Sequence, residues 1–185
     1  KNLVAEEEYE AAAELADTIN WKKVRNVTTL CMVGDIYDKM DRYEDSREVL
    51  LMAYDHAPIG RNIVYKLANL AIKAKDVEAA EEYYNEFSEI ASSDTKKYIL
   101  RYKISCLKDE PLENRISILE ELKEKEYTEE WAYELASLYY KADMAQICVD
   151  ACEELILWFG AGEYVETALE LKKLYQTLTK AQEEK

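Results

Sequence analysis

The segment VTTLCMVGDIYDKMDRYEDSREVLLMAYDHAPIG, residues 27–60, decides how the chain is expected to fold. Its first half carries an apolar stripe at helical spacing, formed by Leu30, Val33, Gly34 and Tyr37. Its second half carries another, formed by Ser46, Leu50 and Ala53. Pro58 then closes the segment, because proline cannot continue a helix. The segment therefore predicts two amphipathic helices joined by a short turn.

The same pattern returns every 34 residues along the chain. In residues 61–94 the two stripes are Val64, Leu67, Ala68 and Ala71, then Ala80, Tyr84 and Phe87. In residues 129–162 they are Ala132, Leu135, Ala136 and Tyr139, then Cys148, Cys152 and Leu155. Residues 95–128 are degenerate, because Tyr102 takes the position of a small residue. We expect the second helix of this unit to shift in register, so that it turns inward Leu112, Ile116, Leu119 and Leu122.

This pattern resembles the tetratricopeptide repeat, with its bulky and small residues and tyrosine on the first helix and its proline at the exit. The resemblance implies an all-α fold, a right-handed superhelical solenoid of antiparallel helix pairs. Because one pair cannot bury its apolar face alone, the pairs must stack. The expected helices, about ten, are 3–18, 24–40, 43–56, 61–74, 77–91, 95–108, 111–125, 128–142, 144–158 and 162–181.

The repeat also predicts how the chain is divided. We expect a single repeat domain, 1–185, composed of a half repeat at 1–26, units at 27–60, 61–94, 95–128 (degenerate) and 129–162, and a terminal helix at 163–185. The half repeat has Ala12, Ala16 and Ile19 where a second helix would place them. Because the array starts halfway through a unit and at Lys1 rather than Met, we expect a fragment of a longer protein.

Composition excludes several classes of protein. The 185 residues include only four glycines and two prolines, too few for the many tight turns of a β-sandwich or barrel. No apolar stretch approaches the roughly 20 residues of a membrane span. The net charge of -15 disfavours nucleic acid as a partner. The four cysteines lie within helical patterns, which favours reduced thiols and a cytoplasmic location.

The residues that chemistry requires are scarce. His56 is the only histidine, and we expect a capping or surface role for it at the end of a helix. Cys148 and Cys152 share a helical face, a spacing compatible with metal ligands, but they fall in packing columns. No phosphate-binding or dinucleotide-binding motif is present. We therefore predict no catalytic residue, no metal and no cofactor.

Charge divides unequally between the two kinds of helix. The second-helix segments 43–58, 77–91, 111–126 and 144–160 sum to -13, whereas the first-helix segments 27–40, 61–75, 95–108 and 129–142 sum to +6. The resemblance implies that first helices line a concave groove. We therefore expect a basic groove that binds a peptide or protein segment, acidic or ending in a carboxyl terminus. The resemblance places in this groove Asn62, Tyr65, Lys66, Asn69, Lys73, Lys96, Ile99, Lys103, Tyr133, Tyr140 and Lys141.

A structural interpretation of the same residues stays open. Lys39, Lys73 and Lys141 all lie in the last turn of a first helix, where a cation interacts favourably with the helix dipole whether or not a ligand binds. The alternative function is a spacer or self-association scaffold for another domain of the parent protein. The sequence does not decide between a monomer and a dimer.

Overall fold

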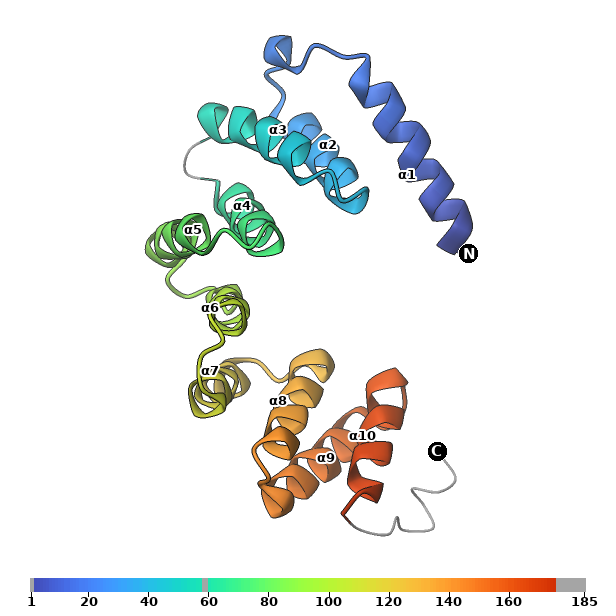
Figure 1. The fold of residues 1–185 in the computed structure, drawn as a ribbon, viewed down its shortest axis with the longest axis vertical. Helices are drawn as coiled ribbons and strands as arrows, with labels where there is room; N and C mark the ends of the chain where they lie inside the picture. Colours follow the sequence, from blue (N-terminus) through green and yellow to red (C-terminus); the bar gives the residue numbers. More distant parts are fainter. Residues whose placement is uncertain (1, 58–59, 176–185) are drawn as a thin grey trace. The chain divides into compact units, whose positions relative to one another are not determined.

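The computed structural model of the chain describes residues 2–57 and 60–175, and within them all regular structure is helical (Figure 1). The elements are α1 (Asn2–Asp17), η1 (Trp21–Lys23, a 3-10 turn), α2 (Val27–Lys39), α3 (Tyr43–His56), α4 (Arg61–Lys73), α5 (Val77–Ile90), α6 (Lys96–Leu107), α7 (Leu112–Lys125), α8 (Glu129–Lys141), α9 (Ala145–Phe159) and α10 (Glu163–Lys173). The predicted all-α class is thus confirmed.

Two predicted helix ends were wrong. The helix expected at 24–40 begins only at Val27, because Asn26 caps it by accepting the N–H of Thr29 at 2.9 Å. The last helix, expected to reach 181, ends at Lys173, and Leu174 directly after it is exposed. The remainder of that prediction, 176–181, lies outside the described residues.

The helix predicted at 3–18 is present as α1, which packs against α2. Ala16 is buried as predicted, and its carbonyl oxygen accepts the indole N–H of Trp21 at 3.0 Å. Ile19 was expected in the same packing column but lies beyond the end of the helix and is exposed. The helix ends at Asp17, one residue before the predicted end, and Ile19 lies in the turn that follows it.

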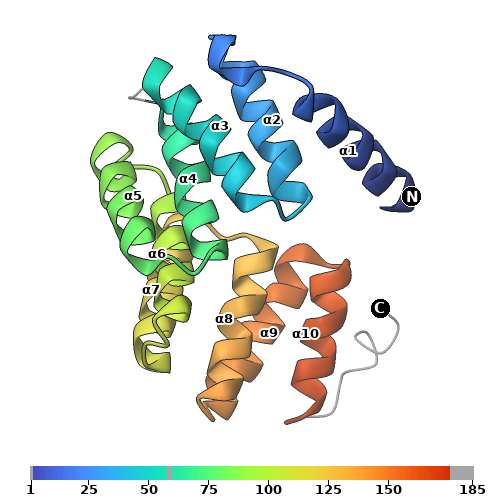
Figure 2. The ribbon, with the colours of Figure 1, turned by 45° about the horizontal axis from the view of Figure 1, so that its top comes forward.

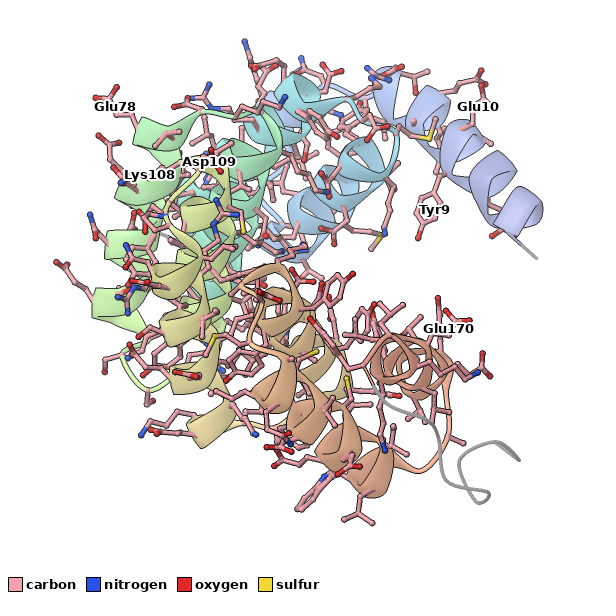
Figure 3. All side chains as sticks on the ribbon, turned by 60° about the horizontal axis from the view of Figure 1, so that its bottom comes forward. Tyr9, Glu10, Glu78, Lys108, Asp109 and Glu170 are labelled. Atoms are coloured by element: carbon pink, nitrogen blue, oxygen red, sulfur yellow. The ribbon has the colours of Figure 1, made fainter. Side chains whose placement is uncertain are left out.

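The turn inside each helix pair repeats with the period found in the sequence. In residues 2–57 and 60–175, four residues other than glycine have positive φ angles, between 52° and 59°, and they are Asp41, Lys75, Asp109 and Asp143. Successive members of this set are 34 residues apart; Asp109, between α6 and α7, is labelled in Figure 3. Each follows a first helix in a left-handed cap; for example, the N–H of Asp76 bonds to the Ala71 carbonyl at 2.9 Å. The period therefore appears in the backbone itself.

The chain forms two compact units, residues 1–100 (unit 1) and 101–185 (unit 2), with the boundary inside α6. In unit 1, α2 packs against α3 and α4 against α5. The predicted stripes of α2 and α3 are buried, with Leu30, Leu50 and Ala53 inaccessible or nearly so. A second cluster in the same unit gathers Val64 and Phe87 around Leu100.

In unit 2, α8 and α10 both pack against α9, and α7 packs against α8 (Figure 2). The register shift expected for the degenerate repeat is confirmed at Ile116, Leu119 and Leu122, which are buried, whereas Leu112 is half-buried. Tyr102 is buried and donates its hydroxyl to Glu134 at 2.5 Å. The large tyrosine is thus buried against α8, where its ring also lies 5.8 Å from that of Trp131.

Gly34 lies where α2 and α3 approach most closely. A Cβ there would meet Cγ and Cδ2 of the buried Leu50 at 2.8 Å, so Gly34→Ala should lower the free energy of unfolding by about 1–3 kcal/mol through overpacking. In a Leu50→Ala background the same substitution should be neutral or stabilising, because alanine favours a helix by about 0.5–1 kcal/mol over glycine. Urea unfolding of the four variants measures both effects. If Gly34→Ala lowered the free energy of unfolding equally in wild type and in the Leu50→Ala variant, contact with Leu50 could not be the cause.

Lys75 is the one member of the turn set that is neither Asp nor Asn, residue types that tolerate positive φ best. Lys75→Gly should therefore raise stability by about 0.5–1 kcal/mol. Ala74→Gly is the matched control, because Ala74 has a right-handed conformation and should lose stability. A loss of thermal stability in Lys75→Gly would show that the lysine side chain contributes more than its backbone strain costs.

Candidate peptide-binding faces

Within each unit, first helices contact one another through side chains at two regular separations. Lys66 of α4 pairs with Asp35 of α2, 31 residues earlier, and Lys73 pairs with Asp38, 35 residues earlier. In unit 2, α8 and α10 repeat both separations with Tyr133–Tyr164 and Tyr140–Tyr175. We call these surfaces the first-helix face of unit 1 (α2, α4 and residues 96–100) and of unit 2 (residues 101–107, α8 and α10).

The first-helix face of unit 1 holds seven of the eleven predicted groove residues, and ion pairs dominate it. The ammonium group of Lys73 lies 2.6 Å from one carboxylate oxygen of Asp38 and 2.7 Å from the other. Lys66 forms a similar pair with Asp35. All four side chains are at least a quarter exposed, so these pairs are screened by solvent. The predicted basic face therefore carries its own counterions.

Aromatic and amide groups complete this face. The Tyr65 ring packs against Phe87 with centroids 5.7 Å apart, and the ammonium group of Lys96 lies 5.1 Å from the same tyrosine ring. The side-chain amide of Asn69 donates to the Tyr65 carbonyl at 2.9 Å. Asn62 is exposed and Ile99 is half-buried. The structure thus brings these predicted residues together on α4 and the start of α6.

The first-helix face of unit 2 differs in chemistry, because tyrosines take the place of ion pairs. The ring centroids are 5.9 Å apart in Tyr133–Tyr164 and 5.6 Å apart in Tyr140–Tyr175. Burial raises the pKa of Tyr164, and nearby carboxylates, first Glu130 and then Glu163, raise it further. Lys103 of α6 is half-buried and Lys141 of α8 is exposed. This face is therefore aromatic, with acid at its edge near Tyr164.

Sequence reasoning missed the partners of the predicted residues. No face was predicted for Asp35, Asp38, Tyr164 or Tyr175. The signal that could have found them is the separation of 31 or 35 residues rather than 34. The neighbour of a residue across the face is found on the next first helix. It lies either about one turn before the position that is equivalent in the repeat, or one residue after it.

Cys148 and Cys152 are packing residues, as the repeat columns indicate. Both are buried, and the Cys148 thiol lies 3.4 Å from the Ala136 carbonyl, at the position where the Ser46 hydroxyl donates to the Gly34 carbonyl at 2.6 Å. Burial raises the pKa of Cys148 and raises that of Cys152 to about 12. Among the described residues no group of three or more His, Cys, Asp or Glu side chains could hold a metal ion.

Solved structures similar to this chain share one architecture. A C-terminal part of a tetratricopeptide repeat-containing protein from Cytophaga hutchinsonii matches with a TM-score of 0.70 and 12% identity, over 98% of this chain and 69% of that one. A thermophilic tetratricopeptide repeat protein from Thermus thermophilus matches with a TM-score of 0.63 and 14% identity, over 80% of this chain and 82% of that one. This chain has the tetratricopeptide repeat fold.

A third similar structure is YrrB, described as a tetratricopeptide repeat protein with an unusual peptide-binding site. It matches with a TM-score of 0.59 and 15% identity, over 91% of this chain and 87% of that one. No protein-family model and no curated protein matches the sequence. In the part of this chain that the structure describes, every helix is too short or too polar to span a lipid bilayer.

The cysteines give a direct test of the packing. The thiolate is the reactive form, so the raised pKa and the burial of Cys148 and Cys152 should protect both from an aromatic disulfide reagent at about pH 8. The exposed Cys106 should react first. Absorbance of the released thiol follows the reaction, and a Cys106→Ser variant identifies the fast phase. Rapid modification of all four thiols in the native protein would contradict this packing.

Proposed function

We propose that this chain is a protein-interaction module and that the first-helix face of unit 1 binds an acidic peptide segment or a carboxyl terminus. The observation that carries the proposal is the row of lysines on α4 and α6, of which two already hold carboxylates. Lys66 and Lys73 each bind one from α2. The carboxylates of Asp35 and Asp38 therefore occupy the positions that the carboxylates of an acidic ligand would take.

A ligand can take the place of these internal carboxylates at small cost. Exposed ion pairs contribute only about 0–1 kcal/mol each, so exchanging Asp35 or Asp38 for a carboxylate of a partner costs little. Lys96, exposed above the Tyr65 ring, adds a cation beside the pairs. The exposed amide of Asn62 can bond to the backbone of an extended peptide.

The similar structures support the class of ligand. YrrB is described as having a peptide-binding site, and its match covers most of this chain. The acidic preference comes from the lysines of this chain alone. The remaining residues predicted from the sequence lie on the first-helix face of unit 2 and take no part in this proposal; they are Lys103, Tyr133, Tyr140 and Lys141.

A second candidate function is a spacer or self-association scaffold for another domain. The same ion pairs favour it, because Asp35 and Asp38 leave their lysines satisfied without any partner. In that case the pairs only join α2 to α4. The two functions differ in what the removal of the internal carboxylates does to binding.

Removing Asp35 and Asp38 discriminates between them. If the face binds acidic peptides, Asp35→Asn/Asp38→Asn should raise the affinity for a fluorescent Asp/Glu peptide by about two- to fivefold, because an internal competitor is lost. Lys73→Glu should weaken binding by at least as much. Fluorescence anisotropy measures both changes, and light scattering records whether the chain is a monomer.

Salt and a matched control complete the experiment. Raising ionic strength from about 0.1 M to about 1 M shortens the screening length from about 10 Å to about 3 Å and should weaken binding strongly. Lys125→Glu is the control, since Lys125 ends α7, a second helix, and should leave affinity unchanged. Affinity indifferent to salt, to Lys73→Glu and to the loss of both carboxylates would leave only the scaffold function.

A further inference from the structure

The most exposed large apolar residues of the described chain lie side by side at the end of α9, in unit 2. Leu157 is 86% exposed and Trp158 is 70% exposed. Neither belongs to a first-helix face, because α9 is a second helix. Folded monomers rarely leave adjacent large apolar side chains uncovered without a binding role.

The other units show that this position needs no apolar residue. The residues that are equivalent to Leu157 and Trp158 in the preceding units are Lys123–Glu124, Glu89–Ile90 and Asp55–His56, at intervals of 34 residues. Asp55 and His56 remain exposed although the hairpin of α4 and α5 follows them in the same unit. A following hairpin therefore does not cover this position. Stacking of repeats gives no reason for leucine and tryptophan there.

Neighbouring rings hold Trp158 in place. The Tyr127 ring meets it edge to face, with centroids 5.7 Å apart and planes at 89°, and also stacks on Phe159 with centroids 5.5 Å apart. The ammonium group of Lys123 lies 5.3 Å from the Tyr127 ring and also pairs with Glu154. An exposed tryptophan that is already ordered loses little entropy on binding, which is a property of interface anchors.

The exposed stripe of α9 has a distinct order of side chains. Ile147, 44% exposed, begins it, and Asp150 and Glu154 follow at helical spacing before Leu157 and Trp158. The stripe thus has apolar ends with acid between them. From Ile147 to Trp158 it is about 16 Å long, at 1.5 Å per residue.

Charge decides what this stripe fits. α9 contains three carboxylates and no lysine or arginine; Glu153 and Glu154 each pair with a lysine of another helix, and Asp150 is exposed. A second copy docking through its own α9 stripe would bring acid against acid, and so would an anionic lipid surface. We propose that the exposed stripe of α9 docks a partner-protein segment that carries apolar residues at its ends and lysine or arginine between them.

The test uses a synthetic helical peptide with leucines at both ends of its apolar stripe and lysines between them. Wild type should bind it, and a matched peptide with glutamate for lysine should not bind. The chain itself supplies the variant, because Leu157→Asp/Trp158→His installs the residues of the first full unit, which are exposed there. This variant should weaken binding of the lysine peptide about tenfold or more.

Two further measurements keep the result interpretable. Circular dichroism establishes that the variant is folded, and hydrogen exchange with bound lysine peptide should show protection in residues 147–158 of wild type. The Asp/Glu peptide of the preceding proposal should bind wild type and variant equally, so failure of one proposal is distinguishable from failure of the other.

Three outcomes would overturn the inference. One is equal binding of the lysine peptide by wild type and variant. Another is a wild-type dimer, seen by light scattering, that Leu157→Asp/Trp158→His converts to a monomer, because the occupant would then be a second copy. The third is Trp158-dependent binding to phosphatidylcholine vesicles without binding of the lysine peptide, because the occupant would then be a lipid surface.

Discussion

Close contact between the two helices of each hairpin is the constraint on which the other features depend. In unit 1, Gly34 leaves room for Leu50 and its carbonyl oxygen accepts the Ser46 hydroxyl. The equivalent pair in unit 2 is Ala136 with Cys148, and both residues are fully buried. Only small residues permit this separation between helices, because interiors are close-packed. The small-residue column therefore fixes the shape of the hairpin before any surface residue matters.

A hairpin of fixed shape places the next first helix at a fixed offset, and so the neighbours across a face are fixed as well. The separations of 31 and 35 residues occur with ion pairs between α2 and α4 and with tyrosine pairs between α8 and the end of α10. The backbone determines which positions lie in contact across a face, and the sequence determines whether the contact is an ion pair or an aromatic pair. One scaffold thus carries a charged face in unit 1 and an aromatic face in unit 2.

The sequence predicted the helices and most of the core because both follow from a periodic pattern. Leu30, Tyr37 and Ala136 are buried where their columns place them. Helix ends were less predictable, since the start of α2 depends on a single cap at Asn26. The face was predicted only in part, because a period locates equivalent positions within repeats. The pairing of Lys73 with Asp38 depends on the offset between helices, which the period does not contain.

Repetition also makes each unit a control for the others. A residue that departs from its column needs a reason that packing does not give, or it must change the packing. At Tyr102 the packing differs, because the large ring is buried with its hydroxyl on Glu134 and the second helix that follows buries Ile116 and Leu119. Leu157 and Trp158 change nothing that the described residues show, because their column is exposed in the first full unit too. A departure that leaves the fold as it is and keeps apolar surface in water adds nothing to the stability of the fold, and burial against a partner is the process that gains free energy from that surface.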